Sequence, residues 1–178
     1  MTVEYRGSFQ TYSWFFLQGL IGSAFLTIIF ENFASGLLLD ILEPQIAKFI
    51  SIVILAPLIE EYFKIYPLFR RRSGDPRTLI LFGFSIGLGF GVAEFLIYVF
   101  MVNIPVLIRL PGLLFHGAST VIATMGIIKG DLAKYYTVAV IVHAAINFLA
   151  QLGTVYIIGG LGTVLFTYVL AYKFYRST

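Results

Sequence analysis

Six apolar runs, each about as long as a lipid bilayer is thick, dominate this sequence. An α-helix needs about 20 mostly apolar residues to cross a hydrocarbon core about 30 Å thick. The runs cover residues 12–30, 49–69, 78–101, 110–128, 135–152 and 155–172. We therefore predict an all-α, polytopic membrane helix bundle of about six transmembrane helices, which forms one integral-membrane domain over residues 1–178.

The longest connection between two of these runs covers residues 31–48. It mixes Glu31, Asp40, Glu43 and Pro44 with several leucines. Such a mixture of charged and apolar residues predicts a loop with a short interfacial helix between the first and second spans.

Composition excludes several classes of protein. Hydrophobic residues make up 59% of the chain and charged residues 12%, against about 25% charged residues in a soluble domain. A disordered tail, a nucleic-acid binder and a soluble enzyme are therefore excluded. The chain has no cysteine, which excludes disulfides and thiolate metal sites.

The basic residues predict the orientation in the membrane. If the N-terminus is cytoplasmic, nine Lys and Arg residues fall on the cytoplasmic side and two, Lys48 and Arg109, on the other. This asymmetry predicts that both termini are cytoplasmic, next to anionic lipid headgroups. The nine are Arg6, Arg70, Arg71, Arg72, Arg77, Lys129, Lys134, Lys173 and Arg176.

Ionisable side chains inside the apolar runs are the most informative feature. A charge at the bilayer centre costs about 2.5–3.5 kcal/mol, so such groups normally face a bundle interior or a wet cavity. Spans two to five carry all of them, together with one asparagine. They are Glu60, Glu61, Lys64, Glu94, His116, His143 and Asn147.

The spacing of these residues favours one shared site. Glu60 and Lys64 are four residues apart, as are Glu94 and Tyr98, and His143 and Asn147. Residues four apart share one face of a helix. Glu94 also continues a stripe of Gly83, Gly87 and Gly91 that lets two helices approach closely.

These groups suit hydrolysis of an amide bond. A carboxylate beside a neutral imidazole can orient and deprotonate a water molecule, and a second imidazole and an amide can donate to an oxyanion. The same groups can instead hold a metal ion, because two histidines and a carboxylate are a common zinc ligand set. The residues leave both possibilities open.

Four motifs in order carry a resemblance to a known family. They are E-E-x-x-K at residues 60–64, F-G-x-x-E-x-x-x-Y at 90–98, Phe115–His116, and H-x-x-x-N at 143–147. Over about residues 45–150, this pattern resembles the PrsW-type intramembrane proteases. Their wider superfamily includes the type II CAAX prenyl endopeptidases and bacteriocin-processing, or abortive-infection, membrane proteins.

The resemblance implies a glutamate-dependent intramembrane endopeptidase. Glu60 would activate the water molecule with His116 beside it, while His143 and Asn147 would bind the oxyanion. Glu61 would belong to the catalytic set as a support for Glu60. The supporting residues outside that set would be Lys64, Glu94 and Tyr98.

The resemblance also implies a membrane-anchored protein substrate and no nucleic-acid partner. This mechanism requires no cofactor, but zinc or another divalent metal is compatible with it. Its ligands would then come from Glu60, Glu94, His116 and His143. Two alternatives stay open: a non-catalytic scaffold subunit of a membrane protease complex, and a proton or ion transporter.

Overall fold

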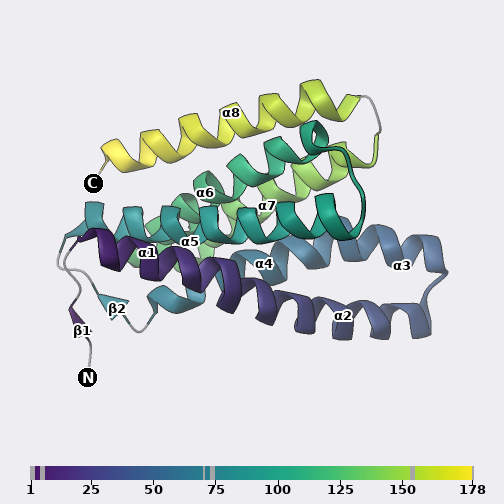
Figure 1. Ribbon diagram of the computed structural model, residues 1–178, viewed down its shortest axis with the longest axis horizontal. Helices are drawn as coiled ribbons and strands as arrows, with labels where there is room; N and C mark the ends of the chain where they lie inside the picture. Colours follow the sequence, from purple (N-terminus) through teal and green to yellow (C-terminus); the bar gives the residue numbers. More distant parts are fainter. Residues whose placement is uncertain (1–2, 5–6, 70, 73–74, 153–154, 178) are drawn as a thin grey trace.

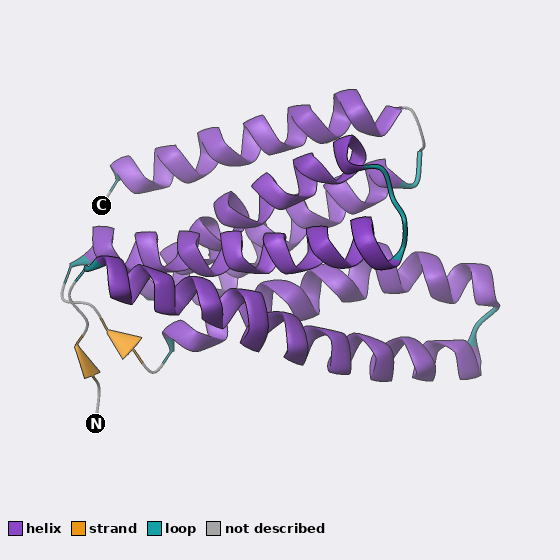
Figure 2. Cartoon of the chain, viewed as in Figure 1, coloured by secondary structure: helices purple, strands orange, loops and turns teal. Residues whose placement is uncertain are grey.

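The computed structural model of the chain is a bundle of long, roughly aligned helices (Figures 1 and 2). It describes residues 3–4, 7–69, 71–72, 75–152 and 155–177. The predicted all-α membrane bundle is confirmed. The only strands within these residues are β1 (Val3–Glu4) and β2 (Arg71–Arg72), each two residues long, which pair in parallel.

Two long rods run side by side on one flank of the bundle. The first joins α1 (Phe9–Leu17), the π-helical segment η1 (Gln18–Ser23) and α2 (Ala24–Ile41). The second joins α3 (Pro44–Ile50), the π-helical segment η2 (Ser51–Leu55) and α4 (Ala56–Ile65), and ends in the 3₁₀ turn η3 (Tyr66–Leu68). Only residues 42–43 separate the two rods.

The remaining helices are α5 (Pro76–Leu96), which continues into the π-helical segment η4 (Ile97–Met101), then α6 (Val106–Lys129), α7 (Leu132–Ala150) and α8 (Val155–Arg176). The described chain ends lie at one end of the bundle. The 42–43 turn and the loop at residues 102–105 lie at the other (Figure 1).

The prediction of a loop at residues 31–48 is wrong, whereas the interfacial position of a short helix there stays a prediction. The first rod stays helical as far as Ile41, and α3, which begins at Pro44, runs directly into the second rod. The physical reason is that Glu31 faces a cavity inside the bundle, so its charge does not require the helix to end there. Proline at the first helical position favours the start of α3.

Four described helices are long and apolar enough to cross a membrane: Phe9–Ile41, Pro76–Met101, Val106–Lys129 and Leu132–Ala150. The chain is therefore a multi-pass integral membrane protein. The other two predicted runs form the second rod and α8, and their crossing stays a prediction. So does the orientation of the termini, for which Arg6 and Arg70 lie outside the described residues.

Local sequence explains where α5 begins. Asp75 is its N-cap, and its carboxylate accepts hydrogen bonds from the backbone N–H groups of Arg77 and Thr78. The Thr78 hydroxyl also donates to Asp75 Oδ2 at 2.7 Å. This side-chain hydrogen bond is the largest cause that lowers the pKa of Asp75 below its ordinary value.

The glycine stripe of α5 brings that helix against α6. A Cβ atom at Gly87 would meet the His116 carbonyl oxygen, and one at Gly83 would meet the Thr124 side chain. Glycine is therefore required where the two backbones approach each other. The close approach places Glu94, one turn beyond the stripe, beside the His116 ring.

Candidate active site

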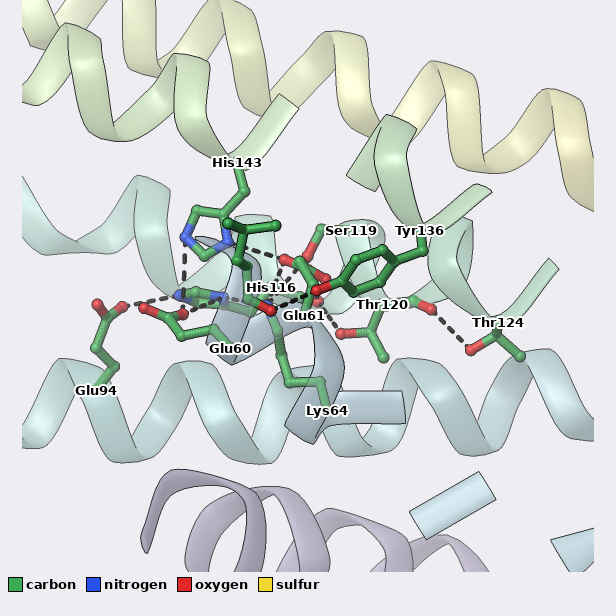
Figure 3. A network of polar contacts seen from close by, with 11 residues as sticks. Glu60, Glu61, Lys64, Glu94, His116, Ser119, Thr120, Thr124, Tyr136 and His143 are labelled. Atoms are coloured by element: carbon green, nitrogen blue, oxygen red, sulfur yellow. Dashed lines mark hydrogen bonds and ion pairs between the residues drawn. The ribbon is translucent and has the colours of Figure 1, made fainter. Parts of the chain in front are cut away.

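A buried polar cluster lies in the middle of the bundle (Figure 3). Three of its side chains come from α4, and one each from α5, α6 and α7. Glu60, Glu61, Lys64, His116 and His143 are at most 5% exposed, and Glu94 is partly buried. The structure thus brings together the ionisable residues of four successive predicted spans. They are Glu60, Glu61, Lys64, Glu94, His116 and His143.

Lys64 and Glu94 fix the His116 ring from its two sides. The Lys64 ammonium group lies 3.0 Å from His116 Nδ1 and donates to Glu61 Oε1 at 2.6 Å. Because an ammonium group has no lone pair to offer, Nδ1 acts as the acceptor. The proton of the neutral ring is then on Nε2, which donates to Glu94 Oε2 at 2.8 Å.

Glu61 orients the second histidine. His143 Nδ1 lies 2.9 Å from Glu61 Oε1, and a carboxylate accepts, so Nδ1 carries the ring proton. The unprotonated Nε2 then faces Glu60, 3.7 Å from its Oε2 atom. Glu61 Oε1 therefore accepts from both Lys64 and His143, which ties α4 to α7.

Possible ligand atoms from three helices come close together at Glu60. Its Oε2 atom is 3.9 Å from His116 Nδ1 and 3.7 Å from His143 Nε2, both beyond hydrogen-bond length. Among the described residues Oε2 has no hydrogen-bond partner, although it is buried. An unsatisfied buried acceptor that faces two ring nitrogens indicates room for a bound water molecule or metal ion.

The donor set fits a metal ion such as zinc. One ligand atom from each of Glu60, His116 and His143 lies within 4.8 Å of the other two. In metal sites, a ligating histidine usually donates its other ring N–H to a carboxylate. Glu61 and Glu94 accept from the two rings in this way. Glu94, predicted from sequence as a possible ligand, lies behind His116 and outside this group.

Arg109 is a site residue that the sequence predicts only as a basic residue at the membrane surface. Its Nη2 lies 2.9 Å from Glu94 Oε2, and its guanidinium carbon lies 3.8 Å from the centroid of the Tyr98 ring. Arg109 thus balances the charge of Glu94 and packs on Tyr98. The sequence does contain one signal that could have identified Arg109 as part of this cluster. It lies seven residues before His116, which places it two turns away on the same face of α6.

Asn147 lies beside the cluster and is held by the backbone of the second rod. Its Nδ2 donates to the Ile52 carbonyl oxygen at 2.9 Å, within η2. Asn147 and Tyr98 both line the cavity that reaches Glu60. The predicted oxyanion role of Asn147 stays a prediction.

A cavity of about 750 Å³ opens onto the cluster. Its walls come from both rods and from α5, η4, α6 and α7, and its lining residues run from Glu60 to Lys48, Val102 and Ile104. Its volume lies within the range of small-molecule sites, about 300–1,000 Å³. Glu31 also lines this cavity, which the sequence does not predict because it places Glu31 in a loop.

Comparison with known proteins identifies the family. No curated protein and no solved structure matches the chain. The sequence does match the family described as "PrsW family intramembrane metalloprotease" over residues 7–173, which is most of its length and more than the predicted 45–150. This match favours a peptidase over the scaffold and transporter alternatives. The chain belongs to the PrsW family of intramembrane metalloproteases, and is thus a membrane-embedded hydrolase of protein substrates.

Proposed function

We propose that the chain hydrolyses a peptide bond of a membrane-anchored protein at the point where Glu60, His116 and His143 meet. The observation that carries this proposal is the convergence of one possible ligand atom from each of these three residues beside a cavity. Burying so many ionisable groups in an apolar bundle is costly, and catalysis is a common reason for it.

In this proposal, Glu60 Oε2, His116 Nδ1 and His143 Nε2 would hold a divalent metal ion. Such an ion acts as a Lewis acid on a peptide carbonyl and makes a water molecule nucleophilic near neutral pH. The charges support this assignment. Lys64 balances Glu61, and Arg109 balances Glu94, which leaves the Glu60 carboxylate without a cation among the described residues.

The surrounding residues would keep the ligands in place. Glu61 holds the His143 ring through Nδ1, and Glu94 holds the His116 ring through Nε2. With its proton on Nδ1, neutral His143 has no N–H left for an oxyanion, so we favour a ligand role for it. Asn147 has a second N–H and lines the same cavity, which keeps it a candidate for contact with the substrate.

A metal-free mechanism is the second candidate. The specific observation in its favour is the 3.0 Å contact between the Lys64 ammonium group and His116 Nδ1, which occupies the lone pair that a metal ion would need. In that case Glu60 would take the proton from a water molecule that it shares with His143 Nε2. Both candidates use Glu60 and both histidines. They differ in their response to a chelator.

We also propose that the cavity opens on the non-cytoplasmic side of the membrane. The cavity reaches the bundle end that carries the loop at residues 102–105, and the chain termini lie at the opposite end. Nine basic residues against two support cytoplasmic termini. A substrate segment would therefore enter from the outer half of the bilayer.

Comparing new N-termini among membrane proteins tests the proposal. Cells would express the wild-type chain, Glu60→Gln, His143→Ala or, as a matched control, Glu43→Gln, which alters an exposed carboxylate outside the cluster. We expect the same membrane-protein fragments with the wild type and with Glu43→Gln. The amount of these fragments should be at least about 100-fold lower with Glu60→Gln and with His143→Ala.

All variants should accumulate in the membrane at similar levels, as measured by immunoblotting of an added tag. Fragments that persist with both Glu60→Gln and His143→Ala would contradict the proposed site.

A further inference from the structure

One wall of the active-site cavity comes from the first rod and carries an acid that belongs to none of the four sequence motifs. Thr27, Glu31 and Ser35 line the cavity from α2 at helical spacing. Elsewhere α2 exposes large apolar side chains, such as Phe25 and Phe33. Glu31 therefore lies on the polar, cavity-facing side of an otherwise lipid-facing helix.

The site leaves one carboxylate oxygen of Glu31 unsatisfied. Glu31 Oε1 is buried and has no hydrogen-bond partner among the described residues. Lys64 pairs with Glu61 and Arg109 pairs with Glu94, so these two cations serve other carboxylates. An unsatisfied carboxylate oxygen is costly inside an apolar bundle. Because Glu31 forms part of a cavity wall, this oxygen indicates a ligand that supplies the missing donor when the cavity is filled.

Glu31 lies between Glu60 and the 42–43 turn that joins the two rods (Figure 1). It is ten residues before the end of α2, whereas Glu60 is 16 residues after the start of α3. At about 1.5 Å per residue, the backbone of Glu31 is nearer the turn by about 9 Å. Lys48, the remaining basic residue of the cavity wall, is exposed and lies nearer still to the turn.

This offset corresponds to a short stretch of substrate. An extended polypeptide rises about 3.3 Å per residue, so about 9 Å is the length of about three residues. A peptide bond cut beside Glu60 would therefore place Glu31 next to a substrate side chain within about three residues of that bond.

We propose that Glu31 is a specificity-determining residue, whose carboxylate binds a lysine or arginine side chain of the substrate close to the cut bond. This inference rests on the proposed function, and it names the substrate class: a membrane-anchored protein with a basic residue within about three residues of the cut bond. A basic side chain is costly inside a bilayer, and an ion pair with Glu31 offsets part of that cost only for a substrate that carries one.

Substrate variants test this specificity without altering the protease. The substrate is a membrane protein that the wild-type chain cuts in cells, and its cleavage is measured from the new N-termini. We expect a lysine or arginine within about three residues of the cut bond. Replacing it with glutamine should lower cleavage about 10-fold or more, because a charge-assisted hydrogen bond is lost. A cut site without a basic residue in this window, or full cleavage of the glutamine variant, would overturn the inference.

Glu31→Gln assigns this preference to Glu31. It keeps a hydrogen-bond acceptor and loses the charge, so it should cut the unaltered substrate about 10-fold or more slowly than the wild type does. It should cut the glutamine substrate variant at the wild-type rate. Glu43→Gln is the matched control, because it makes the same chemical change at an exposed carboxylate that does not line the cavity, and it should keep the wild-type preference. If Glu31→Gln also keeps that preference, the inference is overturned, since Glu31 would then bind a neutral donor such as a backbone N–H.

Exchanging the two charges supplies a gain of cleavage. Glu31→Lys should cut the unaltered substrate poorly, and replacing the substrate's basic residue with glutamate should raise cleavage by this variant about 10-fold or more. No gain in a Glu31→Lys chain that accumulates in the membrane at the wild-type level would overturn the inference. If that chain does not accumulate, Glu31→Gln decides alone.

The same fragments distinguish failure of this inference from failure of the proposed function. Fragments that persist with Glu60→Gln would overturn the proposed function and this inference together. Fragments that require Glu60, but respond to neither the charge of Glu31 nor that of the substrate residue, would overturn this inference alone.

Discussion

Replacing Lys64 with methionine should destabilise the chain strongly, because it leaves a buried carboxylate without its cation. Lys64 and Glu61 are both 0% exposed, and their charged atoms are 2.6 Å apart. Methionine has a similar length and no charge, so the substitution removes the ammonium group without opening a large cavity.

The expected loss of stability follows from the contacts that Glu61 keeps and loses in Lys64→Met. Removing one partner of a buried ion pair costs about 3–5 kcal/mol. Glu61 retains its hydrogen bond from His143, so we expect the lower end of this range. A loss of about 3 kcal/mol corresponds to a change of roughly 100-fold in the folding equilibrium.

Unfolding by a denaturing detergent in mixed micelles, followed by far-ultraviolet circular dichroism, measures this loss. The matched control is the double variant Lys64→Met with Glu61→Gln, which removes both charges and still accepts from His143. We expect it to recover at least half of the lost stability. A loss below about 1 kcal/mol in Lys64→Met, or no recovery in the double variant, would refute this view of the pair.

Four further substitutions test the packing and a helix end. Gly87→Ala should lower the free energy of unfolding by about 1–3 kcal/mol, because its Cβ atom meets the His116 carbonyl oxygen. Gly36 has open space around it, so Gly36→Ala should raise the free energy of unfolding by about 0.5–1 kcal/mol. Equal effects of the two substitutions in the detergent titration would contradict this. Tyr136→Phe loses a 2.6 Å hydrogen bond to an α4 carbonyl and should cost about 0.5–1.5 kcal/mol, so unchanged stability would count against that bond. Because the folded-state pKa of Asp75 is lowered, its stabilisation is present above the unfolded-state pKa and is lost as the pH falls through the folded-state value. The unfolding midpoint of Asp75→Ala should therefore lie below that of the wild type at neutral pH and approach it below pH 3.8; a gap that persists in acid would contradict this.

The sequence predicts the bundle and most of the cluster because both follow from the cost of polar groups in an apolar chain. Glu94 and His143 stand out within long apolar runs, and an apolar helix turns such side chains inward. The glycine stripe of α5 likewise predicts a close helix contact, which the Gly87 approach to α6 bears out.

The sequence does not predict that Glu31 faces the cavity or that Arg109 pairs with Glu94, because both residues stand near the ends of apolar runs. At such positions a charged side chain can reach the membrane surface, so its presence carries no cost that would signal a buried partner. Their inward contacts depend on how far the first rod and α6 extend, which is set by packing between helices. Single-chain periodicity does not contain that information.

Cleavage by the purified full-length chain in proteoliposomes, before and after removal of metal by a chelator, tests the central claim most directly. The substrate is a membrane protein that the wild-type chain cuts in cells. We predict that chelation lowers cleavage at least about 100-fold, that added Zn²⁺ restores it, and that Glu60→Gln, His116→Ala and His143→Ala stay inactive with Zn²⁺. Full cleavage by the metal-free wild type, or by any of these variants, would contradict a metal site built from these three residues.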